Sequence, residues 1–527
     1  MKQIGFKNFR KFENFPTMDL GDITILVGGN NAGKSTVVKA LLLTFDNMRS
    51  MNLSMKNLLS IMSPKFRLDA NNIHNLHIGE FHRALYNEAK KKEIEFFLTV
   101  GSFSFCITVK GDENVETVVS KIEVKDISRG VCFVFDYDNG KMSVDVEKQE
   151  ENERQTRLVD IDTQLYELSN LLKAEKNPEK IANINASIKR LRTRRNSLAH
   201  SSSSKSNKVF VSTTMETYVN IANENIIVNR IRSFAQYISN APQIANKKSK
   251  EYKQELENKH VLQGMQTLFN DIANDLNIVL MTKPVEYIYA HAANQNAIYT
   301  TDDKNDYLAQ TIRDFKEEHI NKGSEEDLFI RKWVGTEGFG IGYDYEINQV
   351  LGSAFGVEIQ TSEKSGSKVQ LADMGMGSIQ MMILLFKLAT FISKYKGRTV
   401  KPTIVIEEPE QNLHPKVQSL LADLFAELNS KYGFKFIVET HSEYLVRKTQ
   451  AIIANKNYED ETVLKENNPF VVYYFDGKDE NRSYYPMEYE ISGAFRNKFG
   501  EGFFDEASRW DMTIIRKEFE LKKKNRK

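Results

Sequence analysis

The chain has 527 residues, of which 41% are hydrophobic and 27% charged, and its 72 basic and 71 acidic residues give a net charge of +1. These values exclude wholesale disorder, a collagen-like repeat and a membrane bundle. No run of about 18 apolar residues occurs, and the start, MKQIGFKNFRKF, lacks the apolar core of a signal peptide. Two cysteines, Cys106 and Cys132, are too few for a disulfide framework. We therefore expect a cytoplasmic protein with no membrane partner.

Residues 1–145 predict strands around one helix. Short apolar strands are expected at 2–10 and 23–28, followed by a helix from Lys34 through Leu43. Residues 94–136 contain four apolar stretches separated by the turn-forming GS, GDEN and SRG, which is typical of β-structure. We take residues 1–145 as the N-terminal lobe of the protein.

A heptad pattern then predicts a coiled-coil hairpin over residues 146–199. Its apolar residues recur at spacings of three and four, broken at Pro178, as two antiparallel helices require. The second helix carries a basic run without an acid: Lys189, Arg190, Arg192, Arg194 and Arg195. Two interpretations stay open, because these side chains could pair with acids of the first helix or contact a partner.

The remaining sequence alternates helices and buried strands. Helices are expected at 216–280, 308–320 and 381–395, and short apolar strands of the kind found in parallel sheets at 403–406, 434–438 and 470–475. These patterns divide the rest of the chain into a helical insertion, 200–340, and a C-terminal lobe, 341–510. A basic tail, 511–527, is expected to be solubilising rather than a binding element.

The sequence GGNNAGKST at 28–36 fits the phosphate-binding pattern G-x-x-x-x-G-K-[ST], with a strand before it and a helix after it. Glycines let backbone N–H groups surround a phosphate, Lys34 supplies a charge, and Ser35 supplies a hydroxyl for Mg²⁺. We expect Lys34 to be a surface loop charge. The predicted nucleotide-binding residues are Gly28, Gly29, Asn30, Asn31, Ala32, Gly33, Lys34, Ser35 and Thr36.

Two later strands end in further polar residues. PTIVIEEPEQNLHP, 402–415, places Glu407 where it could hold the magnesium shell together with Ser35, and Glu408 where it could polarise water. FKFIVETHSEYLV, 434–446, ends in Glu439, Thr440, His441 and Ser442, at the sheet edge where ligands bind. His441 could hydrogen-bond the γ-phosphate or the attacking water, so Glu408 and His441 are the candidate catalytic residues.

The strings NFRKF, GGNNAGKST, DMGMGSIQ, IEEPEQNLHP and ETHSE occur in the order found in ABC-type ATPases of the RecF, SMC and Rad50 group. The chain most resembles the OLD-related bacterial branch, which includes the anti-phage ATPases of Septu and PARIS systems. This resemblance implies an α/β fold, that of a P-loop ABC-type ATPase head with an inserted helical or coiled-coil domain. ATP and Mg²⁺ would be its cofactors, and Arg10 would join the nucleotide-binding residues.

The resemblance also implies a head-to-tail dimer around ATP. Each P-loop would be completed by the partner's glycine-rich signature turn, whose contacts would come from Gly375, Gly377 and Ser378. Asp373 stands where the signature usually has a serine, and no Q-loop glutamine is identifiable near 77–85. The segment 286–312 resembles a family element of unassigned chemistry.

Two functions remain open. About 80 residues follow the histidine loop, too few for the Toprim nuclease domain of OLD proteins, so we expect no nuclease activity here. The favoured hypothesis is an ATPase that acts as a sensor or regulator in anti-phage defence, controlling a separate effector protein such as a nuclease or toxin. The alternative is a DNA-repair ATPase that clamps DNA directly, which makes DNA a further candidate partner.

Overall fold

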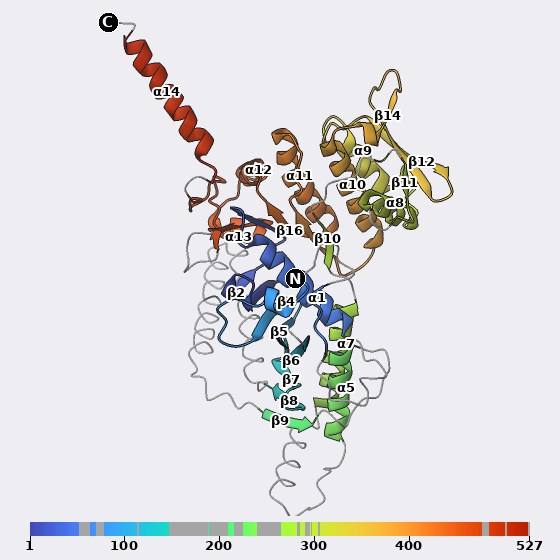
Figure 1. Cartoon of the computed structure of the whole chain (residues 1–527), viewed down its shortest axis with the longest axis vertical. Coiled ribbons are helices and arrows are strands. Elements are labelled where there is room, and N and C mark those ends of the chain that lie inside the picture. The colour runs from blue at the N-terminus through green and yellow to red at the C-terminus, as the bar shows by residue number, and fades with distance from the viewer. Residues whose placement is uncertain are drawn as a thin grey trace, which may run out of the picture.

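The computed structural model (Figure 1) describes fourteen stretches of the chain, and the fold is built from them. They are residues 1–51, 64–69, 78–112, 115–146, 188, 209–214, 225–239, 265–281, 285–289, 296, 298–303, 306–476, 484–500 and 503–524. The coiled-coil hairpin expected at 146–199 lies outside these residues, apart from its first residue and Ile188, and so does the basic run within it.

A six-stranded sheet joins the two ends of the sequence. Its order is β10 (Val285–Ile288), β15 (Thr403–Glu407), β16 (Lys435–Thr440), β3 (Ile23–Gly28), β17 (Phe470–Phe475) and β18 (Tyr485–Met487). Neighbouring strands are parallel except β17 and β18. The strands expected at 23–28, 403–406, 434–438 and 470–475 are confirmed to within two residues. β10 was not expected, because its four residues lie in a segment interpreted as helical.

Alternate residues of this sheet enter two different cores. Leu26 and Val405 pack with α1 (Lys34–Ser50) and the N-terminal strands, whereas Ile25 and Ile406 pack with the helices of the other face. Those helices are α10 (Met376–Lys394), α11 (Pro415–Tyr432), α12 (Glu443–Asn455) and α13 (Glu461–Asn467). Because both faces are covered, the strands are apolar throughout, as the sequence indicated.

An eight-stranded antiparallel sheet forms most of the N-terminal lobe. Its order is β2 (Phe12–Asp19), β1 (Gln3–Phe9), β4 (Glu93–Val100), β5 (Phe103–Asp112), β6 (Val115–Asp126), β7 (Val131–Asp136), β8 (Lys141–Val146) and β9 (Val209–Thr214). Inward-facing phenylalanines bury one side against α1, α5 (Ile226–Ser239) and α7 (Gln266–Met281). The β-rich character expected for 94–136 is confirmed.

Residues 147–208 connect two strands that pair with each other. Val146, the last residue of β8, lies opposite Val209, the first residue of β9. The described residues of 200–340, which were expected to form a helical insertion, include strands as well as helices, since β9 completes the N-terminal sheet and β10 joins the parallel sheet. Strand formation wins there because neighbouring strands offer hydrogen bonds that local sequence patterns do not show.

A third, smaller sheet and two helices lie beside α10. The sheet runs β11 (Tyr299–Thr300), β13 (Ala354–Gln360) and β12 (Asp344–Leu351), with β14 (Lys368–Gln370) pairing β13. The helices α8 (Tyr307–Glu317) and α9 (Glu325–Val334) both contact α10. The helices expected at 308–320 and 381–395 are thus confirmed as α8 and α10, with shifted ends.

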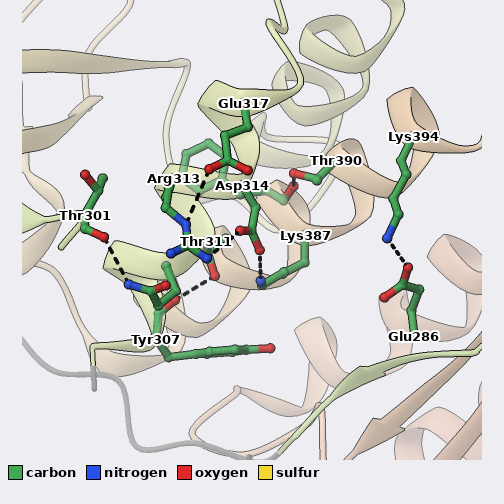
Figure 2. Close-up of polar contacts among 12 residues, drawn as sticks. Glu286, Thr301, Tyr307, Thr311, Arg313, Asp314, Glu317, Lys387, Thr390 and Lys394 are labelled. Carbon is green, nitrogen blue, oxygen red and sulfur yellow. Dashed lines mark hydrogen bonds and ion pairs between the residues drawn. The ribbon is translucent and has the colours of Figure 1, made fainter. Parts of the chain in front are cut away.

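Ion pairs fasten α10 to its neighbours (Figure 2). Lys387 Nζ lies 2.7 Å from Asp314 Oδ2 of α8 and 5.3 Å from the ring centre of Tyr307. Lys394 pairs with Glu286 of β10, which anchors that edge strand to the helix. Among the described residues α10 is the one helix with the length and hydropathy of a membrane span, but two-thirds of it is buried, as in a core helix.

The C-terminal segment forms α14 (Glu506–Lys524), which projects from the rest of the molecule (Figure 1). The tail expected to be basic and solubilising also carries large exposed apolar side chains, including Ile514 at 57% and Phe519 at 69% exposure. The charge pattern alone hid them, because basic and acidic residues separate the apolar ones along the sequence.

Candidate active site

A cavity of about 870 Å³ opens where β3, β15 and β16 end. It brings together most of the predicted site residues, from both ends of the sequence. Its lining consists of Arg10, Lys11, Asn30, Asn31, Ala32, Gly33, Lys34, Ser35, Thr36, Lys39, His82, Arg83, Leu85, Asn87, Glu408, Glu439 and His441. Gly28 and Gly29 are not part of the lining. Both turn their carbonyl groups toward Lys34 instead.

Two glycines are sterically required by the loop at 28–36. Gly28 has φ +155°, and a Cβ atom there would lie 2.5 Å from the carbonyl oxygen of Phe475. Gly33 has φ +113°, and a Cβ atom would lie 2.3 Å from the ring of Phe12. The loop leads directly into α1, whose free N–H groups and dipole favour an anion at the cavity.

Lys34 is buried rather than exposed, which corrects the expectation of a surface loop charge. The residue is only 3% exposed, and its ammonium group donates hydrogen bonds to the carbonyl oxygens of Gly28 and Gly29, each at 3.0 Å. Burial lowers the pKa of the Lys34 ammonium, while Glu439 opposes this shift. The two loop carbonyls thus hold the ammonium group beside the cavity, where its charge could neutralise that of a bound phosphate.

Glu408 and His441 face each other across the cavity. Glu408 Oε1 lies 3.9 Å from His441 Nε2, and Gln411 donates a hydrogen bond to the other Glu408 oxygen. Glu408 has φ +44°, an unfavourable conformation for a residue with a side chain and one often found at functional sites. Burial and the charge of Lys34 lower the pKa of His441, so its imidazole is mainly neutral near pH 7.

Glu410 forms a hydrogen bond with the backbone of the histidine loop. Its Oε1 accepts a hydrogen bond from the backbone N–H of His441 at 2.6 Å, and the residue is buried. Burial raises the pKa of the Glu410 carboxyl group. The third acid of the E-E-P-E string thereby fixes the backbone that carries His441.

The carboxylate nearest to the Ser35 hydroxyl belongs to Glu439, not to Glu407. Ser35 Oγ donates to Glu439 Oε1 at 2.6 Å, and Glu439 is 3% exposed. Burial raises the pKa of Glu439 to about 7, partly opposed by the Ser35 hydrogen bond. The strand order explains this contact, because β16 lies between β15 and β3 and ends beside the P-loop.

Glu407 does not line the main cavity. It lines a small neighbouring hollow with Tyr289, Tyr307 and Gln380, and the hydroxyl of Tyr287 forms a hydrogen bond to its carboxylate. Burial raises the pKa of Glu407, and the Tyr287 hydrogen bond opposes that shift. The segment 286–312, for which the sequence offered no chemistry, therefore reaches this carboxylate through β10.

Several basic lining residues were missed by the sequence analysis. Lys39 lies one turn beyond the P-loop on α1, and His82 and Arg83 come from α2 (Phe81–Ala84). Burial and the nearby Arg83 lower the pKa of Arg10. The signal for His82 and Arg83 was their place in the sequence, because residues 77–85 lie near the expected Q-loop position. No glutamine lines the cavity within the described part of the chain.

The signature-turn residues lie apart from this cavity. Gly375, Gly377 and Ser378 line a second hollow of about 260 Å³ together with Asn412 and His414, at the start of α10 and before α11. Gly377 packs closely there, because a Cβ atom would lie 2.6 Å from the Asn412 carbonyl oxygen. Asp373 belongs to a 3-10 turn, Leu371–Asp373, just ahead of this surface.

Fold and site together define an α/β P-loop ATPase. A glycine-rich loop leads from β3 into α1, and a glutamate pair ends the strand two places away in the same sheet. Residues 1–446 match the model of the AAA ATPase domain family AAA_15, and the chain belongs to that family. It is an ATPase of the AAA_15 type.

Solved structures of SMC head domains are similar at low identity. The Pyrococcus furiosus head with an extended coiled coil has 11% identity and a TM-score of 0.28, covering 90% of this chain and 94% of that chain. The Pyrococcus yayanosii head has 11% identity and a TM-score of 0.31, with coverages of 93% and 97%. The Thermotoga maritima head has 9% identity and a TM-score of 0.30, with coverages of 92% and 98%. No curated protein matches the chain in sequence.

Replacing Lys34 by alanine should leave two loop carbonyls without their donor and remove the phosphate-binding charge. We expect the unfolding free energy to fall by about 1–3 kcal/mol and ATP turnover to slow by about 100-fold or more. Thermal unfolding and phosphate release measure the two effects. Lys11→Ala is the matched control, since Lys11 also donates to a P-loop carbonyl, that of Asn31 at 2.6 Å, but from an exposed position. Equal losses of turnover in both variants would contradict a special role for Lys34.

Replacing Tyr287 by phenylalanine should free the Glu407 carboxylate. A hydrogen bond to a carboxylate lowers its pKa, so its loss should raise the pKa of Glu407 further. The acid limb of the pH–rate profile should then move to higher pH, and kcat should fall by about tenfold with little change in KM. Tyr289→Phe removes a hydroxyl two residues along and should leave the acid limb in place. An unshifted limb in Tyr287→Phe would show that its hydroxyl does not support Glu407 during turnover.

Proposed function

We propose that this chain is a cytoplasmic, Mg²⁺-dependent ATPase head that dimerises around ATP and regulates a separate effector protein in bacterial anti-phage defence. The dimer is supported by the structure's two separated surfaces. The defence role is supported by the resemblance of the E-E-P-E-x-x-L-H-P and E-T-H-S-E strings to the OLD-related branch. We expect no nuclease activity in this chain.

The main observation in favour of an ATP-dependent dimer is that the expected site residues of one chain lie in two separate cavities. The P-loop, Glu408 and His441 share one cavity, while Gly375, Gly377 and Ser378 line a different hollow. The signature residues therefore do not complete their own chain's nucleotide site. A second copy could supply them, and the N-terminus of α10 would then favour its phosphate groups.

The chemistry expected at the cavity is hydrolysis of the terminal phosphate. Lys34 and the N-terminus of α1 bind the phosphates, with Arg10 and Arg83 nearby. Glu408 accepts the proton of the attacking water, and a neutral His441 orients that water or donates to the γ-phosphate. Mg²⁺, when bound, would neutralise phosphate charge. Ser35 and the carboxylates around it offer the oxygen ligands that this ion prefers.

Glu408→Gln should bind ATP but hydrolyse it slowly, because the amide keeps the shape of the side chain and loses its basicity. Sedimentation velocity with ATP should then show more dimer than for wild type. Glu407→Gln is the matched control one residue earlier, outside the main cavity. Dimer trapping by Glu407→Gln alone would reverse the two roles. If neither variant formed an ATP-dependent dimer, the two-surface arrangement would be contradicted.

The segment 147–208 can be removed at a defined point of the fold. Because Val146 and Val209 are paired neighbours, a two-residue turn such as Asn-Gly should join β8 to β9 directly. We expect the shortened protein to keep ATP binding and turnover, since the described residues that line the cavity all come from other parts of the chain. It should lose effector control and protection against phage. Unchanged protection would show that the segment is a spacer.

The DNA-clamping alternative has its own outcome in a binding experiment. Direct contact with phosphates would make affinity fall steeply as salt rises, and DNA would stimulate ATP hydrolysis. If the protein that lacks residues 147–208 no longer bound DNA, the DNA contact would be assigned to that segment. For an effector-controlling ATPase, we expect phage protection to depend on both Glu408 and a separately encoded nuclease or toxin.

A further inference from the structure

We propose that Glu439, at the end of β16, is a ligand of the magnesium ion at the nucleotide site and contributes more to its binding than Glu407. This proposal rests on the ATPase function proposed above and assigns the metal site to different residues. The carboxylate comes from the strand that carries the histidine loop, not from the glutamate pair.

The first support is the position of Glu439 relative to the P-loop. β16 pairs with β3 on one side and β15 on the other, so its last residues lie between the loop and the glutamate pair. Glu439 and Glu407 are direct neighbours in the register of β15 and β16. Of these two glutamates, Glu439 alone accepts a hydrogen bond from the Ser35 hydroxyl, at 2.6 Å, and Glu439 alone lines the main cavity.

The second support is an unsatisfied oxygen. Glu439 Oε1 accepts the hydrogen bond from Ser35, but Glu439 Oε2 is buried and has no hydrogen-bond partner. A buried carboxylate oxygen without a partner is costly, which makes the Glu439 side chain a poor structural element on its own. An ion bound by the serine hydroxyl and this oxygen would remove that cost.

Glu407 is engaged differently. The Tyr287 hydroxyl bonds to its carboxylate, and its hollow is lined by apolar and aromatic side chains. Such a carboxylate can orient a metal ligand or a metal-bound water by hydrogen bonding to it, without contacting the metal itself. No cluster of three or more acidic, histidine or cysteine side chains forms a closed metal site among the described residues. A nucleotide-bound Mg²⁺ does not require one, because it usually takes one or two carboxylates plus phosphates.

The missing Q-loop glutamine is consistent with this assignment. Of the described residues near the expected Q-loop position, His82, Arg83 and Asn87 line the cavity, and they provide basic groups and an amide but no carboxylate. A hard divalent ion prefers anionic oxygen, and of the lining carboxylates Glu439 is the one that contacts the Ser35 hydroxyl.

The experiment measures the binding of a fluorescent ATP analogue to the full chain as Mg²⁺ is raised from micromolar to millimolar, and again in EDTA. The variants are Glu439→Gln, Glu407→Gln and, as a remote buried glutamate, Glu326→Gln. We expect the Mg²⁺ midpoint to rise by about tenfold or more in Glu439→Gln, less in Glu407→Gln, and not at all in Glu326→Gln. Binding in EDTA should be retained in all three variants, because Lys34 and the loop amides remain.

Two results would overturn the proposal. The Mg²⁺ midpoint of Glu439→Gln could equal that of wild type, which would leave the metal to Glu407. Glu439→Gln could also lose nucleotide binding in EDTA, which would assign Glu439 a structural role under the P-loop. Failure of the proposed function looks different, because wild-type protein itself would then bind no nucleotide. Glu439→Asp, which keeps the carboxylate, should recover part of the lost Mg²⁺ affinity.

Discussion

The nucleotide cavity depends on the hydrogen bonding of β3 between β16 and β17. β3 belongs to the first 30 residues, whereas its two partner strands begin at Lys435 and Phe470. Both neighbours of this strand therefore come from the far end of the sequence. Without those pairings the P-loop would still exist as a sequence. It would face neither Glu408 nor His441, because both residues are carried to the loop by strands from the other end.

The same pairing explains which predictions from sequence succeeded. A fully buried parallel strand is apolar throughout and is followed by polar residues, and this pattern is local. GGNNAGKST, IEEPE and ETHSE could therefore be placed at strand ends without any knowledge of pairing. The positive φ angles of Gly28 and Gly33 are local to the loop and favour glycine, which is why the P-loop could be identified from a short string.

What could not be predicted depends on the order of strands and on burial. The contact between Ser35 and Glu439 spans 404 positions and arises because β16 lies next to β3. The burial of Lys34 against its own loop and the hydrogen bond from Tyr287 to Glu407 are tertiary features of the same kind. β9 and β10 were missed because both lie in residues that were interpreted as a helical insertion, whereas each pairs with a strand of a sheet, β8 and β15 respectively.

The pairing of Val146 with Val209 has a consequence for how the family can vary. The entropy lost in closing a loop grows only with the logarithm of its length, and each doubling costs about 0.6 kcal/mol. A sheet edge that holds both ends of an insertion side by side therefore imposes almost no limit on what is inserted. Insertions of very different length could be exchanged at this point through evolution, while the ATPase sheet and its nucleotide cavity stay unchanged.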